Sequence, residues 1–320
     1  MAGDLDISVI IATYNRADIL NDTLENMSRL DRDDINVEFV IVDNNSCDQT
    51  KDVIANFSKS LPIKYLFEPK PGQNYARNRA LGQANLGKIV AFTDDDIYPH
   101  RDWLKAIISA SEKWPNYSVF GGKIYIIWPN VKIPQWAHSS EIKSFAFAEH
   151  DYGDFECSYQ PALGKYPFSG NFWVRRRIFA DGRRFDDAVA WEPDNQILAT
   201  ETKFLSELRQ EGYRFLYCPE SVVGHRVTEK QLSIKYLIKR SYSAGRGVVH
   251  TDSLCREKLL NKHPAVWRFI RAGAIAKLGL ELGLSSIPLA FKKPEYAMEA
   301  MRWIGYNIES LNIARQRQTT

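Results

Sequence analysis

Four short apolar runs alternate with helical patterns in the first hundred residues, and this alternation constrains the fold more than any other feature. The runs cover residues 7–13, 37–43, 63–67 and 89–93. Between them, apolar residues recur every three or four positions, as on one face of a helix. Strands that are covered on both faces of a sheet appear as unbroken apolar runs. The pattern therefore predicts an α/β fold with a mostly parallel central sheet and flanking helices.

The rest of the chain predicts fewer regular elements. We expect helices over 102–114 and 196–210, and strands over 119–128 and 214–217. Residues 129–168 are rich in Pro and aromatic side chains, so we expect an irregular segment there, and loops of that length are usually functional or mobile.

The segment beyond about residue 230 is expected to be helical. Its stretch 266–291 is apolar but carries Arg268, Arg271, Lys277 and Glu281, so it is a poor candidate for a membrane span. A helix pair packed on the body and an interfacial membrane anchor both remain open for this stretch.

The net charge of +3 conceals an uneven distribution along the chain. Residues 1–224 hold 25 Lys and Arg against 32 Asp and Glu, whereas residues 225–320 hold 17 against 7. The main body is therefore acidic, which argues against a nucleic-acid partner. The basic tail indicates either an anionic partner, such as the inner face of a membrane contacted peripherally, or a helical region with a solvated basic face.

The cysteines and the first residues bear on the cellular compartment. Cys47, Cys157, Cys218 and Cys255 are widely separated and form no CxxC pair, which argues against a zinc site or a disulfide framework. The first apolar run begins at Ile7 after acidic residues, unlike a signal peptide. We therefore expect a cytoplasmic protein.

Carboxylates follow two of the predicted strands directly. Asp43 ends the second apolar run, and Asp94, Asp95 and Asp96 follow the fourth. In open α/β sheets, ligands bind beyond the carboxyl ends of the strands. Clustered carboxylates at that edge suit a divalent cation that carries a phosphate, because hard cations prefer oxygen ligands. The alternative is a solvated acidic turn.

Four short motifs occur in an order that is typical of one enzyme family. They are the segments 13–16 (TYNR), 43–48 (DNNSCD), 76–78 (ARN) and 93–96 (TDDD). Over about residues 6–225, the chain resembles the family 2 glycosyltransferases of GT-A fold. The resemblance implies inverting transfer of a sugar from a nucleotide sugar to an acceptor hydroxyl, assisted by Mn²⁺ or Mg²⁺.

The resemblance also implies a domain organisation. Residues 1–225 would form a GT-A (Rossmann-like) catalytic domain, with a nucleotide-binding half over 1–100 and an acceptor half over 101–225. Residues 226–320 would form a basic helical C-terminal extension.

The resemblance assigns a metal site to the acidic cluster. Asp94 and Asp96 match the two ends of the family's DxD motif, and carboxylate oxygens suit Mn²⁺ and Mg²⁺. In family members, a histidine at the position of His225 can complete the metal site. A lone histidine is more often structural, so both roles remain open.

The nucleotide would be bound mainly by residues after the first, second and fourth strands and at the start of the third helix. Asp43 can accept a hydrogen bond from the imide N–H of uracil or thymine, which favours a UDP or dTDP donor, or it can serve as a turn residue. Arg77 suits a diphosphate at a helix start, or an ion pair with an acidic strand end. The expected nucleotide-binding residues are Thr13, Tyr14, Asn15, Arg16, Asp43, Asn74, Arg77, Asp94 and Asp95.

Inverting transfer also requires a base that takes the proton of the acceptor hydroxyl. By resemblance this base is Glu201, although Thr200 stands where the family usually has a second acid. The segment 170–176 resembles the family's donor-sugar and acceptor side. The residues expected on that side are Gly170, Asn171, Trp173 and Trp191, with core packing as the alternative for Trp173.

These inferences predict a glycosyltransferase of polysaccharide or glycoconjugate synthesis. Its partners would be a UDP or dTDP sugar and a glycan or lipid-linked acceptor. Arg226, Lys230, Arg240 and Arg246 follow His225 and would either close over the diphosphate or belong to the basic tail. The alternative is a non-catalytic GT-A subunit that binds nucleotide or glycan.

Overall fold

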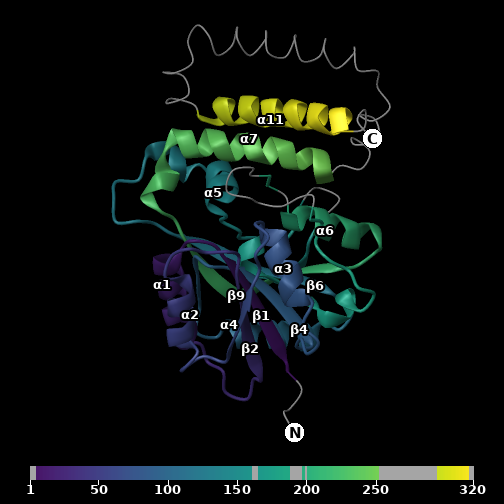
Figure 1. Ribbon diagram of the computed structural model, residues 1–320. Coiled ribbons are helices and arrows are strands. Elements are labelled where there is room, and N and C mark those ends of the chain that lie inside the picture. The colour runs from purple at the N-terminus through teal and green to yellow at the C-terminus, as the bar shows by residue number, and fades with distance from the viewer. Residues whose placement is uncertain (1–4, 161–164, 188–196, 199, 252–293, 317–320) are drawn as a thin grey trace, which may run out of the picture.

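The computed structural model describes residues 5–160, 165–187, 197–198, 200–251 and 294–316 (Figure 1). Within these residues a single sheet has the strand order β3-β2-β1-β4-β8-β6-β9-β5, and β7 pairs with β9. The predicted α/β fold with flanking helices is confirmed.

The first half of the chain forms parallel strands joined by helices. The elements are β1 (Ile7–Thr13), α1 (Ala17–Ser28), β2 (Val37–Asp43), α2 (Thr50–Phe57), β3 (Ile63–Phe67), α3 (Gln73–Leu81) and β4 (Ile89–Asp94). β1 lies between β2 and β4, with Thr13 opposite Asp43 and Ala12 opposite Asp94. This register brings both aspartates to the same edge of the sheet, as the sequence predicts.

Helices cover both faces of this sheet. Val9 and Ile11 of β1 belong to a core shared with α1, α2 and α4 (Trp103–Lys113), whereas Ile10 belongs to a core shared with α3 and α6 (Thr200–Gln210). Successive residues of a strand point to opposite faces, so a strand buried on both sides must be apolar throughout.

The second half of the sheet is mixed rather than parallel. Its strands are β5 (Ile97–Pro99), β6 (Val119–Ile127), β7 (Cys157–Ser158), β8 (Phe172–Arg175) and β9 (Phe215–Arg226). β8 runs antiparallel to both β4 and β6. β9 continues far beyond the predicted end at Tyr217, because a register shift opposite Gly122 and Lys123 absorbs Pro219 in a bulge. Residues 218–220, beyond the predicted end, are therefore part of this strand.

The prediction that 129–168 is irregular is wrong in part. The segment contains the short helices η1 (Gln135–His138) and α5 (Ser140–Phe147). Ile142, Ala146 and Phe147 of α5 are buried together with Leu237 and Met298 from the C-terminal region. An eight-residue helix is marginal alone, so tertiary packing rather than local propensity stabilises α5. Three more short helices are η3 (Ser169–Asn171), η4 (Arg176–Phe179) and η5 (Glu229–Leu232).

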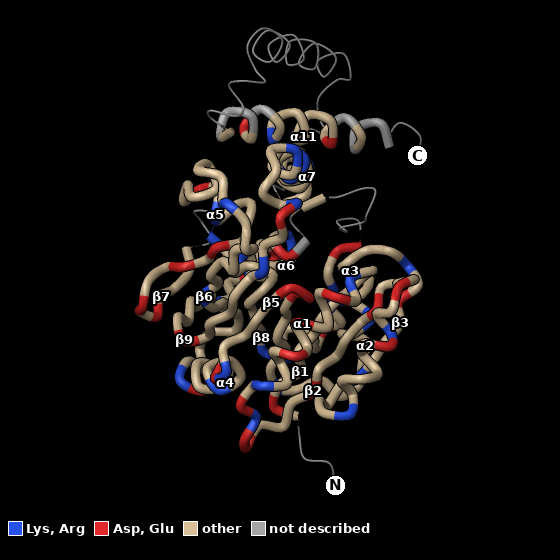
Figure 2. The backbone as a smooth tube through the Cα atoms, turned by 90° about the vertical axis from the view of Figure 1, so that its left-hand side faces the viewer, with Lys and Arg blue, Asp and Glu red and all other residues tan. Residues whose placement is uncertain are grey.

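Two long helices, α7 (Ile234–Thr251) and α11 (Pro294–Gln316), lie beyond the carboxyl edge of the sheet. Figures 1 and 2 show α11 on the side of α7 that faces away from the sheet. A Cβ at Gly245 would overlap the carbonyl of Arg302, so the two helices approach closely only because residue 245 is glycine. The helical prediction beyond residue 230 is confirmed for these two segments.

The α7–α11 interface also contains a buried ionic contact. Glu309 of α11 accepts hydrogen bonds from Nε of Arg246 at 2.7 Å and from Nε2 of His250 at 2.8 Å. The apolar stretch 266–291 lies outside the described residues. Among the helices that are described, none has the length and apolar character needed to cross a bilayer.

His150 lies in an aromatic cluster that supports one side of the sheet edge. Its ring stacks near Phe168, with ring centroids 4.6 Å apart, and its Nε2 lies 2.6 Å from the hydroxyl of Tyr159. Burial lowers the pKa of His150 to about 4. The histidine is therefore neutral in the folded protein at neutral pH.

We expect His150 to make the folded state less stable in acid. In the unfolded chain a histidine titrates near its ordinary pKa of about 6.5, so between pH 6.5 and 4 the unfolded state binds a proton that the folded state excludes. Urea unfolding should show a loss on the order of 2–3 kcal/mol between pH 7 and pH 4 that His150→Phe removes. The exposed His100, changed to Gln, serves as a control that should keep the wild-type pH dependence. An unchanged pH dependence in His150→Phe would contradict this explanation.

Candidate active site

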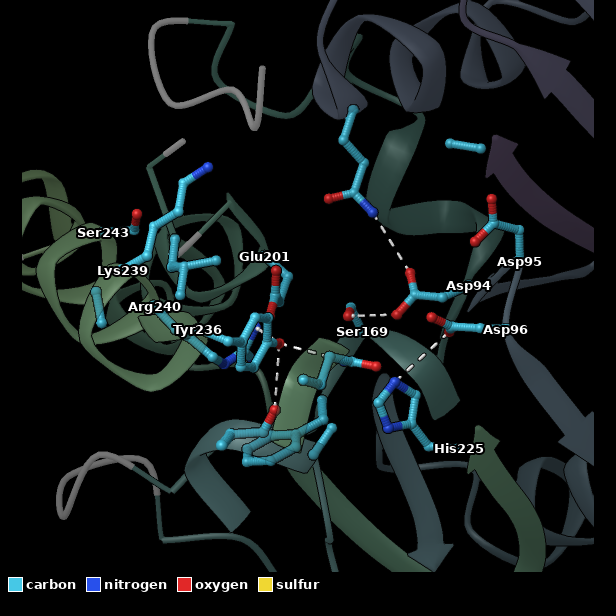
Figure 3. A pocket seen from close by; sticks show the side chains of 18 of the residues that line it. Asp94, Asp95, Asp96, Ser169, Glu201, His225, Tyr236, Lys239, Arg240 and Ser243 are labelled. Atoms are coloured by element: carbon cyan, nitrogen blue, oxygen red, sulfur yellow. Dashed lines mark hydrogen bonds and ion pairs between the residues drawn. The ribbon is translucent and has the colours of Figure 1, made fainter. Parts of the chain in front are cut away.

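A cavity of about 1220 Å³ opens at the carboxyl ends of β1 and β4, beneath α7. One wall carries the acidic cluster Asp94–Asp96 and the loop after β1. The other wall comes from α5, α6, η5 and α7. Figure 3 shows Asp94, Asp96, Ser169 and His225 on one side and Glu201, Tyr236, Lys239 and Arg240 on the other.

The three carboxylates are held by different neighbours. Asp94 accepts a hydrogen bond from the hydroxyl of Ser169 at 2.8 Å. Asp95 accepts one from the hydroxyl of Thr13 at 2.8 Å and pairs with Arg16. Arg16 also pairs with Asp96 at 2.8 Å, so one guanidinium bridges two carboxylates.

Burial and mutual repulsion set the protonation of the cluster. Burial raises the pKa of Asp94 and raises that of Asp95 to about 7, and the charge of Asp96 adds to both shifts. Burial opposes ionisation of Asp96 too, but His225 and Arg16 outweigh it and hold the pKa of Asp96 below its usual value. Asp95 and Asp96 likewise hold the pKa of Arg16 above its usual value against burial. The cluster therefore gathers negative charge that requires nearby cations.

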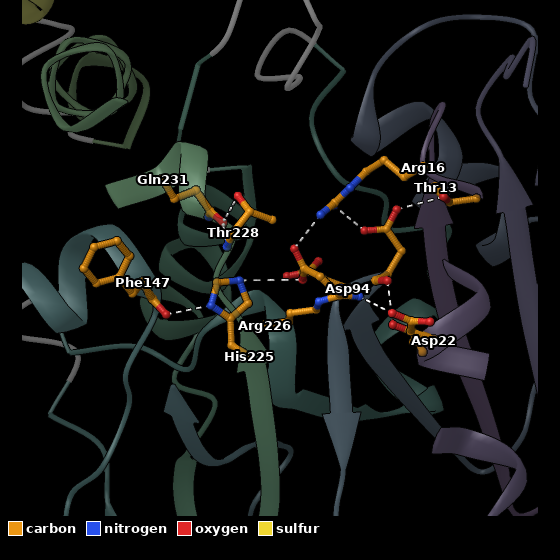
Figure 4. A network of polar contacts seen from close by, with 12 residues as sticks. Thr13, Arg16, Asp22, Asp94, Phe147, His225, Arg226, Thr228 and Gln231 are labelled. Carbon is orange, nitrogen blue, oxygen red and sulfur yellow. Dashed lines mark hydrogen bonds and ion pairs between the residues drawn. The ribbon is translucent and has the colours of Figure 1, made fainter. Parts of the chain in front are cut away.

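His225 faces the cluster from the end of β9. Its Nδ1 lies 2.7 Å from the carbonyl of Phe147, and because a carbonyl can only accept, Nδ1 carries the proton (Figure 4). Nε2 then points toward Asp96, 3.6 Å away. Metal-binding histidines commonly donate their second ring nitrogen to a carbonyl in this way. Strand pairing with Ile97 and Ile126 fixes this position.

The residues around the cluster fit a hard divalent cation. Two carboxylates and one imidazole nitrogen are a suitable donor set for Mn²⁺ or Mg²⁺, with room left for substrate oxygens. Across the parts of the chain that the structure describes, no three His, Cys, Asp or Glu side chains are already gathered around one point as metal ligands. The predicted metal ligands Asp94, Asp96 and His225 do lie together at the cavity.

Glu201 faces the cavity from the first turn of α6. Arg77 lies behind it, with one guanidinium nitrogen 4.0 Å from Glu201 and another 3.9 Å from Asp94. Arg77 is buried and does not line the cavity, so it lies away from the place expected for a diphosphate. The alternative of an ion pair with an acidic strand end describes Arg77 better.

Several other expected nucleotide ligands do not line the cavity. Asp43 is buried and accepts hydrogen bonds from the amide of Ser46 at 2.8 Å and the hydroxyl of Tyr65 at 3.2 Å. Asn15 accepts one from the amide of Cys47 at 2.7 Å, which ties the loops after β1 and β2 together. Asn74 is buried and donates to a carbonyl in the segment after η4. The expected residues that do line the cavity are Thr13, Tyr14, Arg16, Asp94, Asp95, Asp96, Glu201 and His225.

Three of the four residues expected on the donor-sugar side do not line the cavity, and Trp173 follows its core-packing alternative. Trp173 is fully buried in β8, where it stacks on Phe120. Asn171 is also buried, and Gly170 packs against Ile97, whose Cδ1 would lie 2.9 Å from an added Cβ. Trp173 points into the core because β8 is covered on both faces, whereas Gly170 and Asn171 are buried in η3 directly before this strand.

Trp191, the fourth expected residue, lies outside the described residues.

The cavity also contains residues that sequence reasoning missed. Ser169 and Gln73 contact Asp94, and Phe145, Lys239 and Ser243 come from α5 and α7. Ser169 directly precedes the motif that begins at Gly170, which was a usable signal. The sequence gives no comparable signal for the α7 residues, because their place at the cavity depends on where α7 packs against the rest of the protein.

The chain belongs to glycosyl transferase family 2, whose family model matches residues 8–182, more than half of its length. Among curated relatives, the glycosyltransferase AglE of Haloferax volcanii is 32% identical over 126 residues, which are 39% of this chain and 41% of that protein. The chain therefore spans less than half the length of this relative. A dolichyl N-acetyl-alpha-D-glucosaminyl phosphate 3-beta-D-2,3-diacetamido-2,3-dideoxy-beta-D-glucuronosyltransferase of Methanococcus voltae is 27% identical over 263 residues, 76% of this chain and 73% of that one.

Solved structures support the fold assignment. The mannosyltransferase PcManGT of Pyrobaculum calidifontis, in complex with GDP-Man and Mn²⁺, superimposes with a TM-score of 0.60 at 20% identity and covers 97% of this chain and 88% of that one. TarS 1–349 of S. aureus in complex with UDP gives 0.54 at 17% identity and covers 99% and 92%. At these identities the likeness concerns the fold alone, and it is the GT-A fold that the sequence predicts.

We expect Asn171 to be a structural residue rather than a substrate contact. Its Oδ1 accepts from Nε1 of Trp103 at 2.9 Å, and its Nδ2 donates to the carbonyls of Ser221 and Lys123 at 2.8 and 3.1 Å. Asn171→Ala leaves these buried groups without partners, so the free energy of unfolding should fall by about 3 kcal/mol. Urea unfolding measures this loss, with the exposed Asn116→Ala as control. Full stability with weakened nucleotide-sugar binding would contradict the structural role.

Proposed function

We propose that the protein is an inverting, metal-dependent glycosyltransferase of polysaccharide or glycoconjugate synthesis. It would move a sugar from a UDP or dTDP sugar to a hydroxyl of a glycan or lipid-linked acceptor. One observation carries this proposal: the acidic cluster and Glu201 occupy facing sides of the same cavity (Figure 3). A donor bound at the cluster would present its sugar toward Glu201.

The metal would be held by Asp94, Asp96 and His225. When bound, Mn²⁺ or Mg²⁺ would offset the negative charge that develops on the leaving nucleoside diphosphate. Arg16 already neutralises Asp95 and Asp96 from the other side, so it would balance the charge of the cluster. Thr13 and Tyr14 would lie beside the nucleotide.

Glu201 would act as the general base. It would accept the proton of the acceptor hydroxyl while that oxygen attacks the anomeric carbon from the side opposite the diphosphate. A single displacement of this kind inverts the anomeric centre and needs one base rather than a nucleophile. Arg77 would position Glu201 relative to Asp94, because it lies between the two carboxylates.

The choice of UDP or dTDP rests on Asp43. Asp43 lies opposite Thr13 at the carboxyl end of β2, and because its carboxylate is buried there, a base would have to displace the hydroxyl of Tyr65 to reach it. The two structural neighbours hold different nucleotides, GDP-Man in PcManGT and UDP in TarS. A comparison of donor hydrolysis across UDP, dTDP and GDP sugars tests this part of the proposal directly.

The proposed domain organisation assigns residues 1–225 to catalysis and 226–320 to an extension. α7 of the extension lines the cavity, so the extension would complete the site. We therefore propose that the catalytic domain depends on this extension for its acceptor wall.

We expect Asp96→Asn to weaken metal binding. The amide keeps the size of the side chain but removes the charge, so the affinity for Mn²⁺ should fall at least about tenfold. Calorimetric titration with Mn²⁺ measures this without requiring turnover. Asp102→Asn, an exposed carboxylate outside the cavity, should leave the affinity unchanged. Equal affinity in Asp96→Asn and wild type would remove Asp96 from the metal site.

We expect Glu201→Gln to lower transfer while sparing donor binding. General base catalysis typically contributes about 10²–10⁴-fold, so kcat should fall within that range. Turnover with a panel of donor sugars and Mn²⁺ measures the loss. Glu207→Gln on the same helix is the matched control, because Glu207 does not line the cavity. Wild-type turnover in Glu201→Gln would refute the assignment of the base.

A further inference from the structure

The face of α7 that lines the cavity changes in character along the helix. The lining residues fall on one helical stripe, at the spacing of one face. They are Tyr236, Lys239, Arg240, Ser243, Ala244, Val248 and Thr251. The first half of the stripe is cationic, and the second half carries small or apolar side chains. The stripe therefore offers two adjoining environments to one ligand.

The side of α7 that adjoins this stripe is already occupied. Gly245 packs on the backbone of α11, and Arg246 and His250 contact Glu309 of α11. Because α11 holds that side, the cavity-facing stripe has a fixed orientation. The packing of the helix pair thus leaves the basic residues of the stripe on the side of α7 that lines the cavity.

The cations on this wall differ in whether they already contact other protein groups. Arg240 donates from Nε to the carbonyl of Phe145 at 2.8 Å, and its guanidinium lies 5.7 Å from the centroid of the Phe145 ring. Lys239 and Lys230 also line the cavity, but neither forms a side-chain hydrogen bond or an ion pair with any described residue. Two acids of this wall lie near these lysines in the structure or the sequence: Glu201 is paired with Arg77, and Glu229, which precedes Lys230 in η5, forms no ion pair with a described residue. The two ammonium groups are therefore available to an anionic ligand.

We propose that this wall binds an acceptor that carries a phosphate ester of an apolar alcohol. The inference rests on the proposed function, and it names the class of acceptor. Lys239 and Lys230 would bind the phosphate, and Arg240 would shape the wall beside them. The apolar chain would lie along Ala244 and Val248, and the acceptor hydroxyl would reach Glu201 across the cavity. Ammonium groups bind phosphate as point charges, whereas an apolar surface next to them favours a chain over free phosphate.

Three probes separate the parts of this ligand: glucose 1-phosphate, octyl glucosyl phosphate and octyl glucoside, each below its micelle-forming concentration. Calorimetry on the full chain should rank octyl glucosyl phosphate first. The double variant Lys230→Ala/Lys239→Ala should lose about tenfold or more in affinity for both phosphorylated probes. Its affinity for octyl glucoside should not change. Val248→Asn should weaken the two octyl probes but not glucose 1-phosphate.

Lys235→Ala is the matched control, since Lys235 is exposed on the same helix but does not line the cavity. Equal affinity for all three probes, or the same loss in Lys235→Ala as in the double variant, would overturn the proposal. Glucose 1-phosphate binding as tightly as octyl glucosyl phosphate would overturn the part concerning the chain. Metal-dependent hydrolysis of the donor should be present in the wild type and persist in Lys235→Ala. Absent hydrolysis in the wild type would refute the proposed function, whereas the binding comparison would still decide this inference.

Discussion

The arrangement of the molecule depends on three carboxylates confined at one edge of a buried sheet. Asp94, Asp95 and Asp96 repel one another, and burial removes the water that would screen them. The protein offsets this cost with Arg16 and His225, which come from the loop after β1 and the end of β9. The cluster thereby links segments that are far apart in the sequence. The contacts that offset the charge of the carboxylates therefore also hold these segments together.

The parallel half of the fold follows from local sequence because β1, β2 and β4 are buried on both faces, while β3 forms the partly exposed edge. Strands that are buried on both faces need apolar residues throughout, and their shared carboxyl edge follows from the parallel pairing. The position of the acidic cluster at that edge therefore follows from the amino-acid pattern alone. Glu201 and His225 were placed by resemblance to the family, since neither spacing nor composition shows that they face the cluster.

The expected site residues that do not line the cavity share a physical cause. Asn171 and Trp173 occupy positions that match a family motif, but Trp173 lies in β8 between β4 and β6, and Asn171 is buried in η3 just before that strand. Asp43 and Arg77 were assigned by chemical type, yet nearby hydrogen bonds and ion pairs already engage them. The chemistry of a side chain follows from the sequence, whereas the direction in which the side chain points depends on which strands and helices pack around it. Helix α5 was not predicted for the same reason, because its apolar residues are buried through packing with residues of α7 and α11 that are distant in the sequence.

The basic tail illustrates how far composition can be interpreted. The sequence left open whether its charge serves an anionic partner or a solvated face, and the structure shows a third use. Arg226 forms an ion pair with Asp22, and Arg246 forms one with Glu309. The Cζ atom of Arg302 lies 4.1 Å from the centroid of the Phe145 ring. Arg226 thereby connects the end of β9 to α1, and Arg246 and Arg302 connect the C-terminal helices to each other and to α5. The excess of positive charge is thus partly structural, and Lys230 and Lys239 differ from it because they are directed at the cavity without a described partner. The ion pairs and ring contacts of the structural cations hold the C-terminal helices in place, and this placement puts the two lysines at the cavity.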